Sequence, residues 1–255
     1  MSHSIEGLPP EDIGPMESFH LSAKGGAKLN LGCGRAIIPG FINADISPGD
    51  GVDLIVDLNN LGALREYEWY GKVECIYLSH VLEHFPTAQI PLMLKEFFSI
   101  LGEGGMLRLA VPDLDKICRL YVKNINWFNP PHNPWLGLIY GGQIDAHDFH
   151  KTGYNFAYLR WLLLNAGFTS VKEIGPSDDL GIMDGSHSNL PFGNISLNIE
   201  ATKGSGIISK APFLYTPAER LLGWIADVAM RFLQKLVQAR ILLIRRRIRN
   251  RRDRH

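Results

Sequence analysis

The segment KLNLGCGRAIIPGFINAD, residues 28–45, constrains the fold of this chain more than any other stretch. An apolar run enters a Gly-Cys-Gly turn at residues 32–34, and a second extended run then ends on Asp45. Glycine has no Cβ and tolerates strained backbone angles, so such a turn lets the backbone come close to a ligand. An acid at the end of the next strand is a common way for an α/β sheet to bind the hydroxyls of a ribose. The pair predicts a nucleoside-bearing ligand at the carboxyl ends of parallel strands.

The spacing within this segment narrows the choice of ligand. The dinucleotide-binding pattern needs a third glycine three residues after Gly34 and an acid about 20 residues further on. Ile37 stands at the first of these positions, and Asp45 follows Gly34 by only 11 residues. The chain also lacks the Gly-Lys-Ser/Thr of a phosphate-binding loop. A cofactor without a pyrophosphate therefore fits better than a dinucleotide or ATP, although a tight strand exit without any ligand can use the same two glycines.

Five segments in a characteristic order give the chain a family resemblance. They are LNLGCG (29–34), FINAD (41–45), VDLIVDL (52–58), IYLSHVLEHF (76–85) and GGMLRLAVPD (104–113). With these segments the chain resembles the class I S-adenosylmethionine-dependent methyltransferases over roughly residues 27–202. It is most similar to the type 11 branch and its relatives among predicted glycan and surface-polysaccharide enzymes. The resemblance implies methyl transfer from S-adenosylmethionine. It also implies a Rossmann-like α/β fold, with a mixed, mostly parallel seven-stranded sheet and helices on both faces.

The resemblance also implies which residues contact the cofactor. In the relatives the two glycines of the turn bring backbone to the adenosyl and methionyl parts, and Asp45 corresponds to the acid that binds the ribose hydroxyls. Asp57 and Leu58 correspond to the residues beside the adenine, and Ser79 and His80 to those that border the methionyl end. The implied set is Asn30, Gly32, Cys33, Gly34, Asp45, Asp57, Leu58, Ser79 and His80.

Two positions depart from the family pattern, and two of the implied ligands have a simpler interpretation. Asn30 stands where many relatives have an acid, and Ala36 stands where many have a third glycine. Asn30 weakens the expected electrostatic hold on the methionine ammonium. Asp45 could instead be a turn residue at a strand end, and Asp57 begins an Asp-Leu-Asn-Asn sequence that also suits a turn.

Methyl transfer from a sulfonium needs in-line positioning and, for a hydroxyl acceptor, a base. Histidine is the default base because its unperturbed pKa lies nearest neutrality. The sequence DAHDFHKTGY, residues 145–154, is the densest polar cluster of the chain and resembles a string in the glycan-cluster relatives. His150 is the first candidate for the base and His147 the second. Alternatively, both histidines satisfy backbone groups in a rigid loop.

Two further side chains are candidates for the acceptor site. Asp113 follows the fifth strand and is a candidate for orienting the acceptor, and His84 is expected to lie under the substrate channel. His80 and His84 are four residues apart with Glu83 between them, which superficially resembles a metal-binding pair. No third ligand has suitable spacing, so no metal site is predicted.

The chain divides into three parts. Residues 1–26 form a polar lead-in, residues 27–204 form the methyltransferase domain with a lid or acceptor loop at 129–154, and residues 216–255 form a basic amphipathic helical tail. Strands are expected at 28–32, 41–45, 52–56, 74–79, 106–111, 170–174 and 195–201, and helices at 87–101, 113–126 and 155–166. Pro39 and Gly40 argue against a helix between the first two strands.

The tail concentrates positive charge. Residues 218–255 hold 11 Lys and Arg against three acids, a net charge of +8, while the other 217 residues carry −8. A capping sequence, Thr-Pro-Ala-Glu, opens it at residues 216–219. Charged residues interrupt the apolar run too often for a comfortable bilayer span. We therefore predict an interfacial helix that binds an anionic membrane surface through residues 217–254, although the tail could instead pack on the core or on a second subunit.

The family resemblance implies methylation of a hydroxyl of a glycan or lipid-linked saccharide, and with the basic tail it leads us to expect a cytoplasmic protein, peripheral to the inner face of the membrane. The three scattered cysteines are consistent with a reducing compartment. The segment MSHSIEGLPPEDIG, residues 1–14, does not have the apolar core of a secretory signal. One alternative is a nucleic-acid methyltransferase that uses the arginine-rich tail. Another is an inactive methyltransferase fold that serves as a membrane-docked interaction protein. The sequence indicates neither the acceptor atom nor an oligomeric state.

Overall fold

The computed structural model describes residues 26–123, 134–176, 180–190 and 193–204. The predicted lead-in, apart from residue 26, the first residues of the predicted acceptor loop and the whole basic tail lie outside these ranges. Among the described helices, none is long and apolar enough to cross a membrane.

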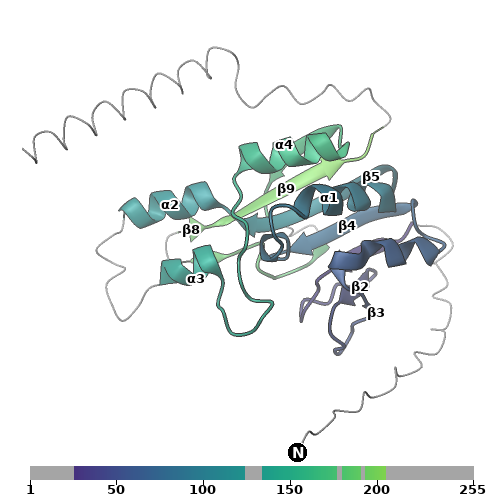
Figure 1. Ribbon diagram of the computed structural model, residues 1–255, viewed down its shortest axis with the longest axis horizontal. Coiled ribbons are helices and arrows are strands. Elements are labelled where there is room, and N and C mark those ends of the chain that lie inside the picture. The colour runs from purple at the N-terminus through teal and green to yellow at the C-terminus, as the bar shows by residue number, and fades with distance from the viewer. Residues whose placement is uncertain (1–25, 124–133, 177–179, 191–192, 205–255) are drawn as a thin grey trace, which may run out of the picture.

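A seven-stranded sheet organises the described chain, with the strand order β3-β2-β1-β4-β5-β9-β6 (Figure 1). The first five strands pair in parallel, and β9 runs antiparallel to both β5 and β6. The strands are β1 (Lys28–Leu31), β2 (Ile42–Asp45), β3 (Leu54–Ile55), β4 (Val73–Ser79), β5 (Leu101–Pro112), β6 (Ser170–Ile174) and β9 (Ser196–Thr202). A separate hairpin joins β7 (Asn189–Leu190) to β8 (Gly193–Asn194). The order and directions confirm the predicted Rossmann-like, mostly parallel sheet.

The helices are η1 (Leu58–Glu66), η2 (Leu82–His84), α1 (Ile90–Ile100), α2 (Leu114–Lys123), α3 (Pro134–Tyr140) and α4 (Phe156–Ala166). Helices η1, α1 and α4 bury their apolar residues with the strand side chains of one sheet face in a single cluster. α4 begins where the Asn155 side chain accepts from the Tyr158 amide and ends at Gly167, whose φ is 121°. α2 and α3 lie beyond the carboxyl ends of the parallel strands, at the left of Figure 1.

The second face of the sheet differs from the first. Its apolar cluster is small and consists of Ile38, Tyr77 and Ile182, with Phe41 and Leu180 packed against them. No helix of the described ranges contributes a residue to this cluster. The expectation of helices on both faces is therefore confirmed for one face, whereas loops cover the other within the part of the chain that the structure describes.

The loop between β1 and β2 explains this difference, because it crosses the sheet without a helix, as Pro39 and Gly40 predicted. Asn43 holds the loop in place: its side-chain oxygen accepts from the Ile38 amide at 2.8 Å, and its side-chain nitrogen donates to the Phe41 carbonyl at 3.2 Å. Three helical segments were not among the expected helices, and the shortest of them is η2. η1 follows β3 directly, and α3 lies inside the stretch that was expected to be a continuous loop.

Candidate functional site

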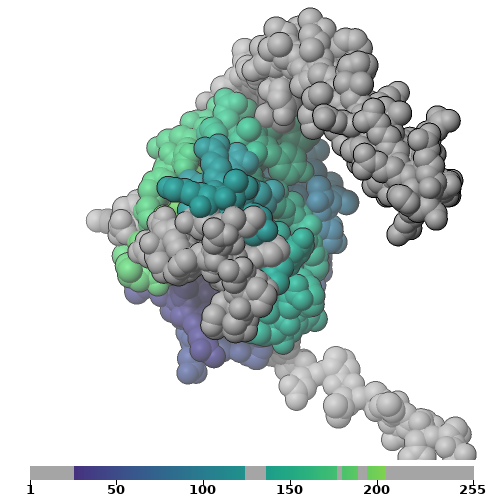
Figure 2. All heavy atoms as spheres, turned by 90° about the vertical axis from the view of Figure 1, so that its left-hand side faces the viewer, coloured from purple at the N-terminus to yellow at the C-terminus, as the bar shows by residue number. Residues whose placement is uncertain are grey.

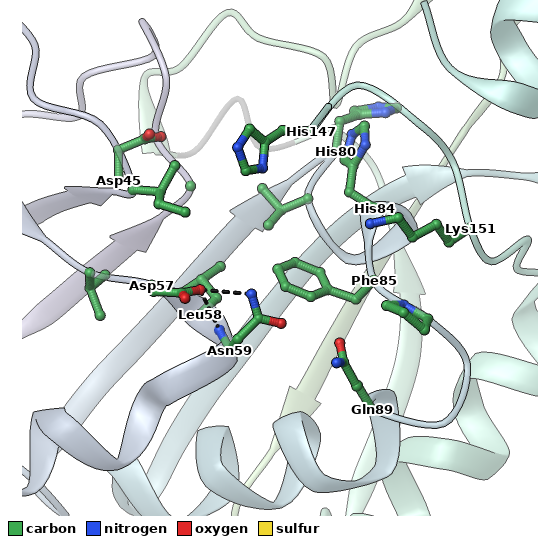
Figure 3. A pocket seen from close by; sticks show the side chains of 15 residues that line it. Asp45, Asp57, Leu58, Asn59, His80, His84, Phe85, Gln89, His147 and Lys151 are labelled. Carbon is green, nitrogen blue, oxygen red and sulfur yellow. Dashed lines mark hydrogen bonds between the residues drawn. The ribbon is translucent and has the colours of Figure 1, made fainter. Parts of the chain in front are cut away.

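A pocket of about 330 Å³ opens where the parallel strands β1 to β4 end (Figure 3). The same end of the molecule, with the purple early residues below and the teal α2 region above, faces the viewer in Figure 2. The pocket is lined by Gly32, Asp45, Ile46, Val56, Asp57, Leu58, Asn59, His80, Val81, His84, Phe85, Pro86, Gln89, His147 and Lys151. This is the edge of an α/β sheet where ligands bind.

The glycine turn forms one wall of the pocket. Gly32 has a φ of 66°, and a Cβ at this position would lie 2.6 Å from a methyl carbon of Val81. Only glycine fits there, because the backbone has a positive φ and also lies against Val81, which follows β4. Gly34 has a φ of 50°, and its amide donates to Asp45 Oδ2 at 2.8 Å. The turn thus orients the acid that the sequence paired with it.

Cys33 is the middle residue of the turn, but it is buried and does not line the pocket. Its amide donates to the Ala44 carbonyl at 3.0 Å, which joins the turn to the end of β2. Burial of the thiol, together with the nearby charge of Asp45, raises the pKa of Cys33 to about 11. The thiol is therefore protonated near neutrality and is not a nucleophile.

Two carboxylates reach the pocket from neighbouring strand ends, and backbone groups hold each of them. Asp45 Oδ1 accepts from the Ser47 amide at 3.1 Å, in addition to its bond from the glycine turn. Asp57 Oδ1 accepts from the Asn59 amide and from its side-chain nitrogen, both at 2.8 Å, and so caps η1. Each acid is thus a turn residue and a pocket residue at once, so the two interpretations of the sequence are compatible.

Asn30 does not reach the pocket. It is buried, and its side-chain nitrogen donates to the Ala36 carbonyl at 2.7 Å and to Asn43 Oδ1 at 2.9 Å. Asn30 therefore stabilises the loop between β1 and β2 on the second face of the sheet. The predicted contact between Asn30 and the cofactor is not present among the pocket-lining residues.

His80 follows β4 and borders the pocket with a strained backbone, at a φ of 55°. Its Nδ1 lies 3.0 Å from Glu83 Oε1, and its Nε2 lies 2.8 Å from the Ser196 hydroxyl. Burial disfavours the imidazolium, but the hydrogen bond and charge of Glu83, with the Gly185 carbonyl, outweigh burial and raise the pKa of His80. The three contacts fix the ring at the pocket edge.

Ser79 ends β4 but does not line the pocket. It lies beside a hydrogen bond that the Tyr77 hydroxyl donates to Asp184 Oδ2 at 2.7 Å. Burial, followed by this bond, raises the pKa of Tyr77 to about 12. Burial alone would raise the pKa of Asp184, but its hydrogen bonds from Tyr77 and Ser186 outweigh that effect and lower it. This pair ties β4 to the loop before β7, on the second sheet face.

The predicted catalytic residues separate into two groups. His84 and His147 line the pocket, whereas His150 and Asp113 do not. His150 packs its ring against that of His84, with 5.0 Å between the ring centroids. Burial, partly opposed by the charge of Glu83, lowers the pKa of His150. His150, the first candidate for the base, therefore lies against His84 and outside the pocket lining, whereas His147, the second candidate, lines the pocket.

Asp113 has a structural role instead of the predicted one. Its Oδ1 accepts from the amides of Asp115 and Lys116, which caps α2, and its Oδ2 lies 3.2 Å from the Lys116 ammonium. Its side chain is 9% exposed and lies outside the pocket lining. An acid directly before a helix commonly caps it, and the sequence places Asp113 directly before the first residue of α2.

Several pocket residues were not predicted from the sequence. Ile46, Val56 and Phe85 provide apolar walls, and Asn59, Gln89 and Lys151 add polar groups (Figure 3). The sequence indicated these residues only by their position in the chain. Ile46, Val56 and Asn59 lie within a few residues of a predicted strand end, and Lys151 lies in the polar 145–154 cluster. Phe85 ends the IYLSHVLEHF segment, and Gln89 lies near the start of the predicted helix 87–101.

The chain was also compared with known proteins. No protein-family model and no curated protein matches it. A SAM-dependent methyltransferase from Archaeoglobus fulgidus is similar in structure, with a TM-score of 0.43 and 15% identity over 71% of this chain and 87% of the other. The CurJ carbon methyltransferase gives a TM-score of 0.43 and 15% identity over 73% of this chain and 50% of the other.

Human N-acetylserotonin methyltransferase, solved in complex with SAM (S-adenosylmethionine), gives a TM-score of 0.41 and 14% identity over 70% of this chain and 48% of the other. The chain thus spans about half the length of two of these three proteins. At such identities and TM-scores the likeness carries no argument about activity. The fold rests on strand order and direction, and function rests on the residues of the pocket.

Proposed function

We propose that this chain is an S-adenosylmethionine-dependent methyltransferase. The observation that carries the proposal is the convergence of the glycine turn and two backbone-anchored carboxylates, Asp45 and Asp57, on one pocket at the carboxyl ends of β1 to β3. The pocket lies within the size range of small-molecule sites and combines apolar walls with a few fixed polar groups.

The pocket residues suit the parts of this cofactor in order. Asp45 would accept hydrogen bonds from both ribose hydroxyls, because it lines the pocket and backbone amides orient its two carboxylate oxygens. The adenine would lie beside Leu58, between apolar side chains, with Asp57 accepting from its amino group. The methionyl end would extend past Gly32 toward His80. The sulfonium methyl would then face the histidine-rich side of the pocket.

For the acceptor we propose a hydroxyl of a glycan or lipid-linked saccharide. The support is the resemblance of the 145–154 segment to the glycan-cluster enzymes, together with the position of His147 and His84 in the pocket lining. His147 replaces His150 as the proposed base, because it is exposed and lines the pocket while His150 lies behind His84. The base would take the hydroxyl proton as the oxygen bonds to the methyl carbon, and the carbon–sulfur electrons would stay on sulfur.

Transfer of labelled methyl groups tests the proposal. The purified protein is incubated with methyl-labelled S-adenosylmethionine and separate fractions of glycolipid, polysaccharide, RNA and protein. We expect label in a saccharide fraction, and a His147→Asn variant that binds the cofactor normally but transfers at least tenfold more slowly. Label confined to RNA would support the nucleic-acid alternative, and label confined to protein would also contradict the saccharide proposal.

We propose further that residues 217–254 bring the enzyme to an anionic membrane surface at the cytoplasmic face. The support is the segregation of charge between this segment and the rest of the chain. Sedimentation with liposomes of phosphatidylglycerol and phosphatidylcholine tests it. We expect the full chain to co-sediment with the anionic liposomes and a chain that lacks residues 217–255 to stay in solution. Equal sedimentation of both proteins would contradict the role of the tail.

A further inference from the structure

A second chemical site lies at the wall of the pocket, where three potential metal ligands meet. Glu83 and His84 come from η2, and His150 comes from the 141–155 loop, which joins α3 to α4. One ligand atom from each of the three side chains lies within 4.8 Å of the other two. The sequence paired His80 with His84 beside Glu83, whereas the fold brings His150 to Glu83 and His84.

The backbone holds the cluster together before any ligand is present. The amides of Lys151 and Thr152 both donate to the Glu83 carbonyl, at 2.7 and 3.1 Å. The Thr152 hydroxyl donates to the Phe85 carbonyl at 2.8 Å. These bonds clamp the loop that carries His150 onto η2. A preorganised set of ligands needs little rearrangement on binding an ion.

In the described residues, one carboxylate oxygen of Glu83 has a hydrogen-bond partner and the other has none. Its side chain is 1% exposed, and Oε1 pairs with His80 Nδ1 at 3.0 Å. Oε2 is buried, with no hydrogen-bond partner among the described residues. Buried polar atoms are almost always partnered, and an orphaned charged oxygen calls for an explanation such as an ion.

The two histidines are oriented in the way that metal ligands usually are. His84 Nδ1 lies 3.3 Å from the Phe149 carbonyl oxygen, so its Nε2 is the nitrogen left for another partner. The backbone of Leu138 lies beside the His150 ring and partly opposes the lowering of its pKa. Metal-bound histidines almost always donate their second ring nitrogen to such an oxygen, which fixes the tautomer and the direction of the ligating nitrogen.

We propose that Glu83, His84 and His150 bind a divalent transition-metal ion of the Zn²⁺ class. Two imidazole nitrogens and one carboxylate oxygen form a ligand set of catalytic zinc sites, which keep a coordination position for water or substrate. Ligand bonds of about 2 Å place two ligand atoms roughly 3 to 4 Å apart, so small side-chain movements suffice. Because His84 lines the pocket, the ion would lie where a water or hydroxyl oxygen can complete its coordination.

Other charged groups near the cluster leave room for a cation. Both ring nitrogens of His80 already have partners, since Nδ1 lies 3.0 Å from Glu83 Oε1 and Nε2 lies 2.8 Å from the Ser196 hydroxyl. Lys151 lines the pocket and is exposed, and its long stem lets the ammonium stay in water. This proposal does not rest on the proposed cofactor, because the three ligands are not among the residues proposed to bind it.

Calorimetric titration of ZnCl₂ into chelator-treated full-length protein tests the site. We expect one tight site per chain in the wild type. Glu83→Gln and His150→Asn should each weaken it by more than the 10–100-fold that follows loss of a mere supporting partner. His147→Asn is the matched control, because it removes a histidine three residues earlier in the same loop and should leave the affinity unchanged.

The result that would overturn the proposal is absence of Zn²⁺ binding in the wild type, or equal affinities for His147→Asn and His150→Asn. A Co²⁺ absorption spectrum of the wild type keeps the test decisive if a variant does not fold. Intense visible bands of a low-coordinate site support the proposal, and the weak spectrum of aqueous Co²⁺ contradicts it. S-adenosylmethionine titrated into the same metal-free protein reports separately on the proposed function.

Discussion

The two sides of the pocket are built by different means. On the side of β1 to β3, each polar group is fixed by residues within about a dozen positions, as when the Gly34 amide binds Asp45. On the side of β4, the groups come from distant segments: His80 contacts Ser196, and His84 packs on His150. The first side is a set of local turns, and the second exists only once the chain has folded.

This difference matters for function as well as for folding. Local turns at strand ends preorganise two carboxylates, which suits the binding of one constant ligand. The long-range side joins η2 to the 141–155 loop, so the chemistry there can change when one loop residue changes, while the sheet stays the same. We infer that the first side binds the cofactor and the second side selects and activates the acceptor.

The largest effect is expected from the glycine turn. Gly32→Ala should lower the free energy of unfolding by about 3 kcal/mol, because it combines a left-handed backbone with a clash against Val81. Gly34→Ala is the matched control, since its φ is also positive but a Cβ meets nothing within 4 Å. It should cost only about 1 kcal/mol. Urea denaturation measures both, and equal losses would contradict a specific role for the approach at Gly32.

A smaller effect is expected from the polar network under the turn. Asn43→Ala would leave the Ile38 amide and the Asn30 side chain without their acceptor, at a cost of about 2 kcal/mol. Asn165→Ala on α4 is the control, because this exposed side chain bonds only within its own helix, to Trp161. Its effect should stay within about 0.5 kcal/mol. A near-neutral Asn43→Ala would show that the loop does not depend on this network.

The smallest effect is expected on the long-range side, as a pH dependence. The folded-state pKa of His80 is raised, so its stabilisation is fully present below the unfolded pKa of about 6.5 and is lost as pH rises through the folded value. With a chelator present, the stability difference between the wild type and His80→Asn should shrink over that window. Urea denaturation at a series of pH values measures it. Parallel profiles for the two proteins would contradict the His80–Glu83 pairing.

The same comparison explains what the sequence could predict. The seven strands of the main sheet, α1 and α4 follow from local signals, namely apolar periodicity and caps, and the pocket position of Asp45 follows from its place at a strand end. The pocket positions of Asp57 and His80 were expected only from the family resemblance. The second sheet face did not follow, because its apolar cluster joins residues that lie far apart in the sequence, namely Ile38, Tyr77 and Ile182.

The acceptor side was harder to predict for a physical reason. His150 and His147 look alike in the sequence, and only the clamp between the 141–155 loop and η2 decides which of them enters the pocket. Glu83 lies between His80 and His84 in the sequence, and only tertiary contacts add His150 to this group. Asp113 was a cap that resembled a site residue, because both lie at strand ends.

The central claim is that the turn and Asp45 bind S-adenosylmethionine, and calorimetric titration of this cofactor tests it most directly. Asp45→Asn keeps an oxygen for the Gly34 amide but loses the charge, and Asp50→Asn makes the same change at an exposed position outside the pocket lining. We predict binding by the wild type and by Asp50→Asn with equal affinity, and binding about 10- to 100-fold weaker for Asp45→Asn. No binding by the wild type, or equal affinities for all three proteins, would contradict the account.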